Sequence, residues 1–141
     1  EPLLIKGIYA CVKKNINRKK NYAFVKEWIQ RVDSTSRMNC YFTKHPDHSI
    51  VLYGIGEIGR LVLNTLSESA KKKIAFIIDK NVNILTEYEV IELEQLKNKD
   101  EKTIECIIIT AIAHEEEIRR SIEEITAIRI VSLYDILRET C

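Results

Sequence analysis

"IVLYGIGEIGR", residues Ile50–Arg60, contains three of the four glycines in this 141-residue chain. The stretch joins a short apolar run, which predicts a buried β-strand, to a segment with apolar residues at helical spacing. Gly54 permits a tight turn, Gly56 lets a phosphate approach the backbone, and Gly59 lets the helix pack closely on the strand. Unpaired N–H groups at the start of that helix favour an anion. The stretch therefore predicts the first strand–turn–helix unit of a nucleotide-binding fold.

A carboxylate follows the next predicted strand at the distance that such a fold uses. Asp79 lies twenty residues after Gly59, at the end of the apolar run Lys73–Asp79. An acid at this place accepts hydrogen bonds from ribose hydroxyls and repels a 2′-phosphate. The position favours NAD over NADP, and the neighbouring Lys80 reduces that preference.

Apolar runs alternate with amphipathic segments over the rest of residues 49–141. Strands are predicted at 49–54, 73–79 and 105–110, helices at 57–69 and 114–125, an extended piece leading into a short helix within 88–99, and a strand with a last helical turn within 128–139. Apolar strands separated by helices form parallel sheets that are covered on both faces. The pattern predicts an α/β fold, a three-layer doubly wound parallel sheet of Rossmann-like type with an N-terminal helical extension.

Residues 1–48 differ from the remainder in charge. They contain ten Lys and Arg against four Asp and Glu, whereas residues 49–141 contain twelve against seventeen. We interpret residues 1–48 as a basic helical N-terminal extension and connector, and residues 49–141 as a Rossmann-like nucleotide-binding domain. A basic segment of this kind docks on its own acidic body, on a partner subunit or on a polyanion, and the first two are favoured over nucleic acid.

Two short helices are predicted in the extension, at residues 3–14 and 21–32. A solvated loop is expected at 13–20 and a connector at 33–48. Large apolar side chains in the second helix require a covering surface, because short helices are marginal alone; they are Tyr22, Phe24, Val25, Trp28 and Ile29. We expect the extension to pack on a helix beside the sheet and to form a homodimer through these N-terminal helices.

The bulk composition is that of a soluble globular protein, with 45% apolar and 30% charged residues and a net charge of +1. No apolar run is long enough to predict a membrane span. The four cysteines are scattered and form no C-x-x-C pair, which favours a reducing, cytoplasmic compartment. The first residue is Glu1 and not Met, which is typical of a processed or excised piece of a longer protein.

Further candidate site residues follow the third predicted strand. Thr110 and His114 lie at the strand end that lines the ligand crevice in doubly wound folds. The predicted cofactor-binding residues are Gly54, Ile55, Gly56, Glu57, Ile58, Gly59, Asp79, Lys80, Thr110 and His114. His45 and His48 are three residues apart, but Pro46 between them prevents their alignment on a helix, so no metal site is predicted. No catalytic residue is assigned, because no complete active site is visible.

Four segments carry a resemblance to a known group: "VLYGIGEIGRLVLNTL", "IAFIIDKN", "YEVIELEQL" and "CIIITA". They resemble the Rossmann-type domains of bacterial surface-polysaccharide and nucleotide-sugar enzymes. These include the N-terminal domains of sugar-nucleotide acyltransferases and modules that accompany sugar dehydratases and methyltransferases. Tyr53–Gly59, Asp79 and Val90–Leu96 match the group's turn, strand-end acid and extended segment, and Ile55 stands where the group has a small residue. The resemblance covers about residues 49–137 and implies binding of NAD(P) or a nucleotide sugar.

Three functional hypotheses follow. The first is a module that binds NAD or a nucleotide sugar within a larger sugar- or surface-polysaccharide-modifying protein. The second is a small oxidoreductase or epimerase-like subunit that another chain completes. The third is a degenerate Rossmann domain used for assembly or regulation. The expected ligand is NAD, with NADP or a nucleotide sugar as alternatives.

Overall fold

Five short strands form one parallel sheet in the computed structural model, which describes residues 2–139. The strands are β1 (Ile50–Tyr53), β2 (Ile74–Ile78), β3 (Val90–Ile91), β4 (Cys106–Ile109) and β5 (Arg129–Ser132). Their order across the sheet is β3-β2-β1-β4-β5, and every neighbouring pair is parallel. This is the strand order of a Rossmann-like sheet. The predicted α/β fold class is confirmed.

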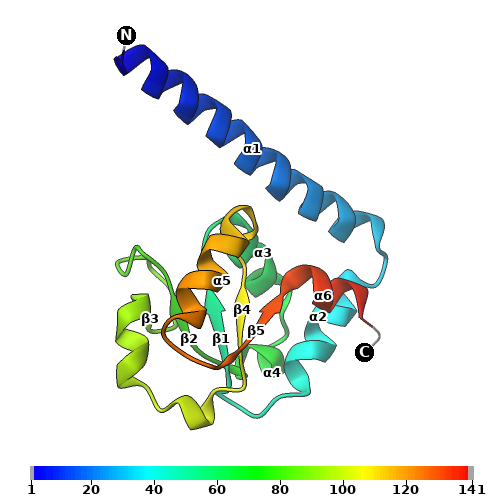
Figure 1. The fold of residues 1–141 in the computed structure, drawn as a ribbon. Coiled ribbons are helices and arrows are strands. Elements are labelled where there is room, and N and C mark those ends of the chain that lie inside the picture. The colour runs from blue at the N-terminus through cyan, green and yellow to red at the C-terminus, as the bar shows by residue number, and fades with distance from the viewer. Residues whose placement is uncertain (1, 140–141) are drawn as a thin grey trace.

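Each face of the sheet carries its own apolar core, because successive side chains of a strand point to opposite faces. Leu52 and Ile108 belong to the core beneath helices α2 (Ser34–Thr43), α3 (Glu57–Thr65) and α6 (Leu133–Arg138). Val51 and Ile107 belong to the core on the other face, together with Ile122 of helix α5 (Glu115–Glu123). Figure 1 shows the resulting helix–sheet–helix layers.

The connections are short helical pieces close to the predicted positions. The segment within 88–99 contains β3 and a 3-10 helix, η1 (Leu93–Asn98), and two further 3-10 helices are η2 (Glu101–Thr103) and η3 (Ile112–His114). The helix predicted at 57–69 is divided, because Leu66 and Ser67 are extended and a second helix, α4, runs over Glu68–Lys71. The Ser67 hydroxyl caps α4 by accepting a hydrogen bond from the N–H of Ala70 at 3.2 Å.

The N-terminal extension begins with one long helix and not with two short ones. Helix α1 runs without a break from Pro2 to Gln30, so the loop predicted at 13–20 is wrong. No Pro or Gly occurs between residues 8 and 45, and Lys and Arg are good helix formers even where they are fully solvated. The N-terminal half of α1 projects beyond the body in Figure 1.

The predicted connector at 33–48 is also wrong in part, because residues 34–43 form helix α2. Its buried apolar side chains are Met38, Tyr41 and Phe42, which follow one another at helical spacing. Asn39 on the same helix joins it to the break after α3: its Nδ2 donates to the Thr65 carbonyl at 2.9 Å, and its Oδ1 accepts from the Ser67 N–H at 2.7 Å.

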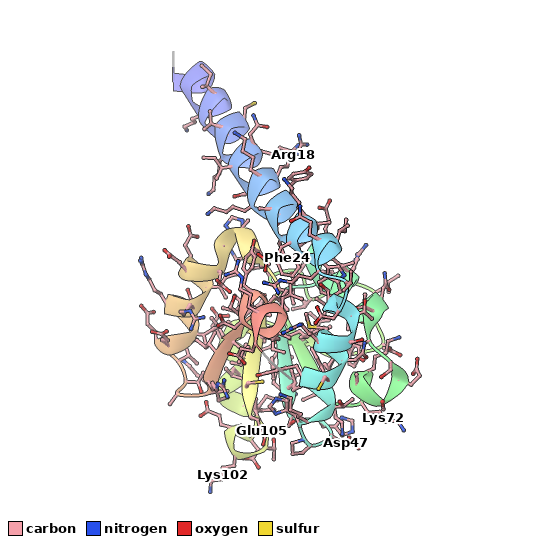
Figure 2. The ribbon with its side chains drawn as sticks, turned by 90° about the vertical axis from the view of Figure 1, so that its right-hand side faces the viewer. Arg18, Phe24, Asp47, Lys72, Lys102 and Glu105 are labelled. Atoms are coloured by element: carbon pink, nitrogen blue, oxygen red, sulfur yellow. The ribbon has the colours of Figure 1, made fainter. Side chains whose placement is uncertain are left out.

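The C-terminal end of α1 packs against a helix beside the sheet, as expected. Phe24 is fully buried, and its ring meets the ring of Tyr134 in α6 edge to face at 5.2 Å. Figure 2 shows Phe24 where α1 meets the body and Arg18 farther along the helix. The expectation fails for Tyr22 and Ile29, which are 69% and 73% exposed. The buried face is the one that carries Phe24 and Trp28.

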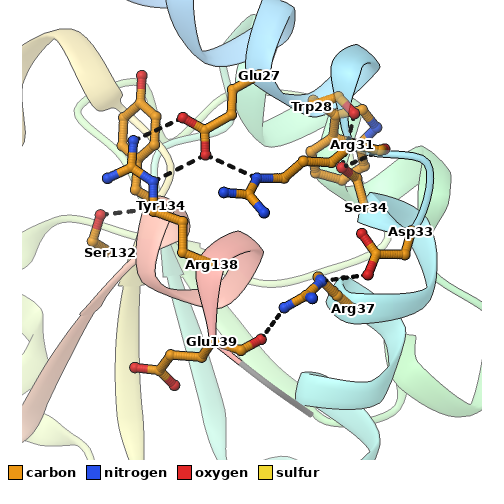
Figure 3. A network of polar contacts seen from close by, with 10 residues as sticks. All are labelled: Glu27, Trp28, Arg31, Asp33, Ser34, Arg37, Ser132, Tyr134, Arg138 and Glu139. Atoms are coloured by element: carbon orange, nitrogen blue, oxygen red, sulfur yellow. Dashed lines mark hydrogen bonds and ion pairs between the residues drawn. The ribbon is translucent and has the colours of Figure 1, made fainter.

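A polar network closes this junction (Figure 3). The Glu27 carboxylate accepts hydrogen bonds from Nη2 of Arg138 at 2.7 Å and from Nε of Arg31 at 3.2 Å. These bonds lower the pKa of Glu27, with the bond from Arg138 as the largest cause. The guanidinium of Arg138 also lies over the ring of Tyr134, 4.5 Å from its centroid. Helices α1 and α6 are therefore joined by both apolar and charged contacts.

The cysteines differ in their chemical state. Cys11 and Cys106 carry free thiols, whereas Cys40 is disulfide-bonded. A disulfide does not favour a reducing compartment. The cytoplasmic location therefore stays a prediction. Within residues 2–139, no helix combines the length and the apolar character that crossing a membrane requires.

Candidate functional site

The glycine turn is held in shape by Asp79 at the end of β2. Its Oδ2 accepts a hydrogen bond from the backbone N–H of Ile55 at 2.9 Å, and its Oδ1 accepts from the N–H of Asn81 at 2.9 Å. Asp79 was predicted as a ribose contact, and the sequence did not reveal this bracing role. Each carboxylate oxygen has a second lone pair, so the same side chain remains able to accept a hydrogen bond from a ligand hydroxyl.

Thr110 braces the turn from the opposite side. Its Oγ1 lies 2.7 Å from the carbonyl oxygen of Gly54 and 3.1 Å from that of Tyr53, and its hydroxyl donates to these acceptors. The side chain is only 2% exposed. Thr110 was predicted to bind cofactor, and its position makes it chiefly a support for the turn.

The three glycines of the turn have different reasons to be glycine. Gly54 has a φ of +102°, a conformation that side chains disfavour. A Cβ on Gly59 would lie 2.7 Å from the carbonyl oxygen of Gly54, so the close contact of helix and strand excludes it. Gly56 differs, since a Cβ there would meet no heavy atom within 4 Å apart from its chain neighbours. Apart from a modest preference for glycine at this N-cap, the fold gives no reason for the bare Cα of Gly56, and the space beside it is open for a ligand.

That space belongs to a crevice of about 340 Å³ between the β1–α3 turn and the segment after β4. The strand order reverses between β1 and β4, which is where doubly wound folds bind ligands at the carboxyl ends of the strands. The crevice brings together eight of the ten predicted residues: Gly54, Gly56, Glu57, Ile58, Gly59, Asp79, Thr110 and His114. Ile55 contributes its N–H to Asp79, but its side chain is buried in the core, 4% exposed, and does not narrow the crevice.

Two neighbouring cavities extend the crevice toward β2 and β3. One, of about 410 Å³, is lined by Gly54, Asp79, Lys80 and His114 among others. The other, of about 460 Å³, shares Asp79 and Lys80 with it and ends at Leu93. Cavities of this size accept small-molecule ligands. Lys80, the tenth predicted residue, thus lies on the Asp79 side of the site and away from Gly56.

Tyr53 lines both of these neighbouring cavities. Burial raises the pKa of its phenol, and the negative charge of Asp79 adds to the effect. The phenol therefore keeps its proton at neutral pH and can donate a hydrogen bond. The sequence places Tyr53 at the strand end and in the turn motif, and no ligand contact was predicted for it.

Helix α1 covers one side of the crevice, which the sequence analysis did not anticipate. Asn17 and Asn21 line the same crevice as Gly56 and His114. The Nδ2 of Asn17 donates to Nε2 of His114 at 3.4 Å, and Nζ of Lys20 donates to the carbonyl of Ala113 at 3.4 Å. Asn17, Asn21, Phe24 and Trp28 follow one another at helical spacing. This spacing was the signal in the sequence from which a single continuous helix could have been predicted.

The comparisons with known proteins add nothing to this geometry. No protein-family model, no curated protein and no solved structure matches the chain.

Proposed function

We propose that the chain is a nucleotide-binding Rossmann module whose ligand lies in the crevice between the glycine turn and the segment after β4. The observation that carries the proposal is the open space beside the Cα of Gly56, at the start of helix α3 and at the strand-order reversal. A phosphate at this place receives N–H groups from the helix N-terminus. A side chain at residue 56 would occupy the same space.

The nucleoside half of the ligand is assigned to the side of Asp79. The Asp79 carboxylate faces the cavity that continues toward Leu93, and it accepts hydrogen bonds from hydroxyl groups. NAD is the favoured ligand, because a carboxylate disfavours the 2′-phosphate of NADP. A nucleotide sugar fits the same description, since it also carries a ribose and a diphosphate.

The biological setting of the proposal rests on the resemblance to nucleotide-sugar and surface-polysaccharide enzymes. The segments that carry this resemblance are the glycine turn, the β2 end and the β3–η1 segment. The proposal is supported by the adjacent cavities that these three segments line, since all three cavities share Asp79. We therefore propose that the module serves a sugar-modifying protein.

A homodimer through helix α1 is the proposed assembly. Ile8, Val12 and Ile16 lie four residues apart on the part of α1 that projects from the body, and they are 57%, 51% and 48% exposed. Three aligned apolar side chains on an isolated helix favour an apolar partner surface. A second copy of the same stripe supplies one, because a two-fold axis pairs a surface with itself.

Calorimetric titration of the purified protein with NAD⁺, NADP⁺ and UDP-glucose tests the ligand proposal. Wild-type protein is expected to bind NAD⁺ or UDP-glucose, and Gly56→Val is expected to lose that binding while it retains cooperative unfolding. Equal affinity of the two proteins refutes the phosphate site. If wild-type protein binds none of the three ligands, the chain is a Rossmann-like domain with another role, such as assembly.

A further inference from the structure

We propose that helix α1 forms one wall of the ligand site, and that Lys13, Asn17 and Asn21 contact a nucleoside diphosphate that carries a second, uncharged polar group. The inference rests on the proposed function, because it places the ligand in the same crevice. It adds three contact residues from a segment outside the Rossmann-like domain. It also defines the chemical class of the part of the ligand that lies beyond the phosphates.

The stripe of α1 residues that faces the body changes from apolar to polar along the helix. Phe24 and Trp28 are buried where the helix covers the apolar core. Three and seven residues before Phe24, where the helix passes over the crevice, the stripe continues with Asn21 and Asn17 instead of apolar residues. A helix that only packs on its own body gains more from apolar side chains at such positions, because a covered amide must find hydrogen-bond partners.

Within the protein alone, the side-chain amides of Asn17 and Asn21 lack a full set of hydrogen-bond partners. Asn17 bonds to His114 at the long distance of 3.4 Å. The side-chain amide of Asn21 forms no hydrogen bond within the part of the chain that the structure describes, although it is half-buried and lines the crevice. An amide presents both donors and an acceptor, so these two side chains suit hydroxyl or carboxamide groups.

Lys13 continues the same stripe one helical turn before Asn17. It lines the cavity that also contains Asp79 and His114, between the nucleoside side and the Gly56 side of the site. This cavity and the crevice share Gly54, Asp79 and His114, and within the proposal the Lys13 ammonium group is assigned to the phosphates, where a positive charge offsets that of the ligand and of Glu57. The resulting order along the site is nucleoside at Asp79, phosphates at Gly56 and Lys13, and the second polar group at Asn17 and Asn21.

Two matched pairs of probes test this order by calorimetry: ADP with NAD⁺, and UDP with UDP-glucose. The longer member of each pair adds a polar group beyond the phosphates, a carboxamide-bearing nucleoside in one case and a hydroxyl-rich sugar in the other. Asn17→Ala and Asn21→Ala are expected to weaken the longer members about three- to tenfold and to leave ADP and UDP unchanged. Lys13→Gln removes the positive charge that is proposed to lie near the phosphates. We therefore expect it to lower the affinity about tenfold for both members of whichever pair binds.

The same helix offers matched controls. Asn15→Ala and Lys14→Gln change the same residue types at exposed positions that line none of these cavities. Both controls are expected to bind all probes as the wild type does. Unfolding midpoints of every variant, measured beside the titrations, separate a lost contact from a lost fold.

The outcomes separate this inference from the proposal on which it rests. A wild-type protein that binds none of the four probes overturns both. Binding that is lost in Gly56→Val but unchanged in Lys13→Gln, Asn17→Ala and Asn21→Ala overturns the contribution of α1 alone. An equal loss of short and long probes in the two asparagine variants overturns the assignment of the amides to the second group. The pair whose longer member binds more tightly identifies the ligand as a dinucleotide or a nucleotide sugar.

Discussion

The carboxylate of Asp79 accepts a hydrogen bond at 2.9 Å from the backbone N–H of Ile55, so the end of β2 holds the turn that follows β1. The acid that the sequence assigns to the ligand therefore also maintains the shape of the glycine turn, where we propose that a phosphate binds. A change at this residue is expected to affect both ligand binding and stability.

Asp79→Asn is expected to lower both ligand affinity and stability. An asparagine keeps one acceptor oxygen, whereas Asp79 uses both oxygens for the N–H groups of Ile55 and Asn81. The loss of one charged acceptor should lower the free energy of unfolding by about 1–3 kcal/mol. Chemical denaturation without ligand and titration with NAD⁺ and NADP⁺ measure the two effects, and the preference for NAD⁺ should narrow. Unchanged stability would show that the turn does not depend on the carboxylate.

Gly59→Ala and Gly56→Ala should separate the fold from the site. The new methyl group at residue 59 meets the carbonyl oxygen of Gly54 at 2.7 Å, which is expected to cost about 1–3 kcal/mol. At residue 56 the methyl group meets no such atom, so a loss below about 1 kcal/mol is expected from the poorer N-cap alone. Urea unfolding compares the two variants. A larger loss for Gly56→Ala than for Gly59→Ala would contradict these glycine assignments.

Phe24→Ala tests whether α1 is part of the folded body. The side chain is fully buried and packs on Tyr134, so its removal should lower the free energy of unfolding by about 3–5 kcal/mol. Tyr22→Ala is the matched control, because the exposed Tyr22 side chain should contribute less than about 0.5 kcal/mol. If both variants unfold as the wild type does, α1 is not docked in solution.

The charged contact between α1 and α6 should make stability depend on acid. The hydrogen bond from Arg138 is the largest cause that lowers the folded-state pKa of Glu27 below its usual value. A lowered carboxyl pKa stabilises the fold above the unfolded-state pKa, and this contribution is lost as the pH falls through the folded-state pKa. Thermal unfolding between about pH 6 and 2 should show a smaller loss of stability in Glu27→Gln than in the wild type. Glu123→Gln, at an exposed position without an ion pair among the described residues, should follow the wild-type curve.

Light scattering tests the homodimer. Wild-type protein is expected to be a dimer, and the double variant Ile8→Lys, Val12→Lys is expected to be a monomer, because it places charges in the exposed apolar stripe of α1. Ile29→Lys changes an exposed apolar residue on another part of the same helix and should remain dimeric. A monomeric wild type would refute the dimer and leave the packing of Phe24 unaffected.

The sheet could be predicted well from the sequence, because each core strand is recognised from a few consecutive residues. The runs around Leu52, Ile77 and Ile108 are apolar and bounded by polar residues, and all three are core strands in the structure. The position of Asp79 at the end of β2 was predictable for the same reason. Its bond to the N–H of Ile55 was not, because two segments that are 24 residues apart must first be placed side by side.

The errors concentrate in residues 1–48, where the sequence contains few signals that begin or end a helix. The basic run around Lys13–Lys20 was interpreted as a loop from its charge, although solvated Lys and Arg are compatible with a helix. The helical spacing of Met38, Tyr41 and Phe42 was a signal for α2. The polar residues around them made this spacing hard to recognise. The contact between Asn17 and His114 joins parts of the chain that are 97 residues apart. It could not be predicted as long as α1 was expected to be two short helices.

Helix α1 is continuous from its anchor past the crevice to its far end, so a tilt at one place is transmitted along its whole length. It is anchored near Trp28, passes the crevice at Asn17 about 16 Å farther along, and reaches Pro2 about 39 Å from the anchor, at 1.5 Å per residue. A tilt about the anchor that moves Asn17 by 1 Å therefore moves the far end by about 2.4 Å if the helix stays straight. A change in the occupancy of the site that shifts Asn17 is thus amplified mechanically at the opposite end of the rod.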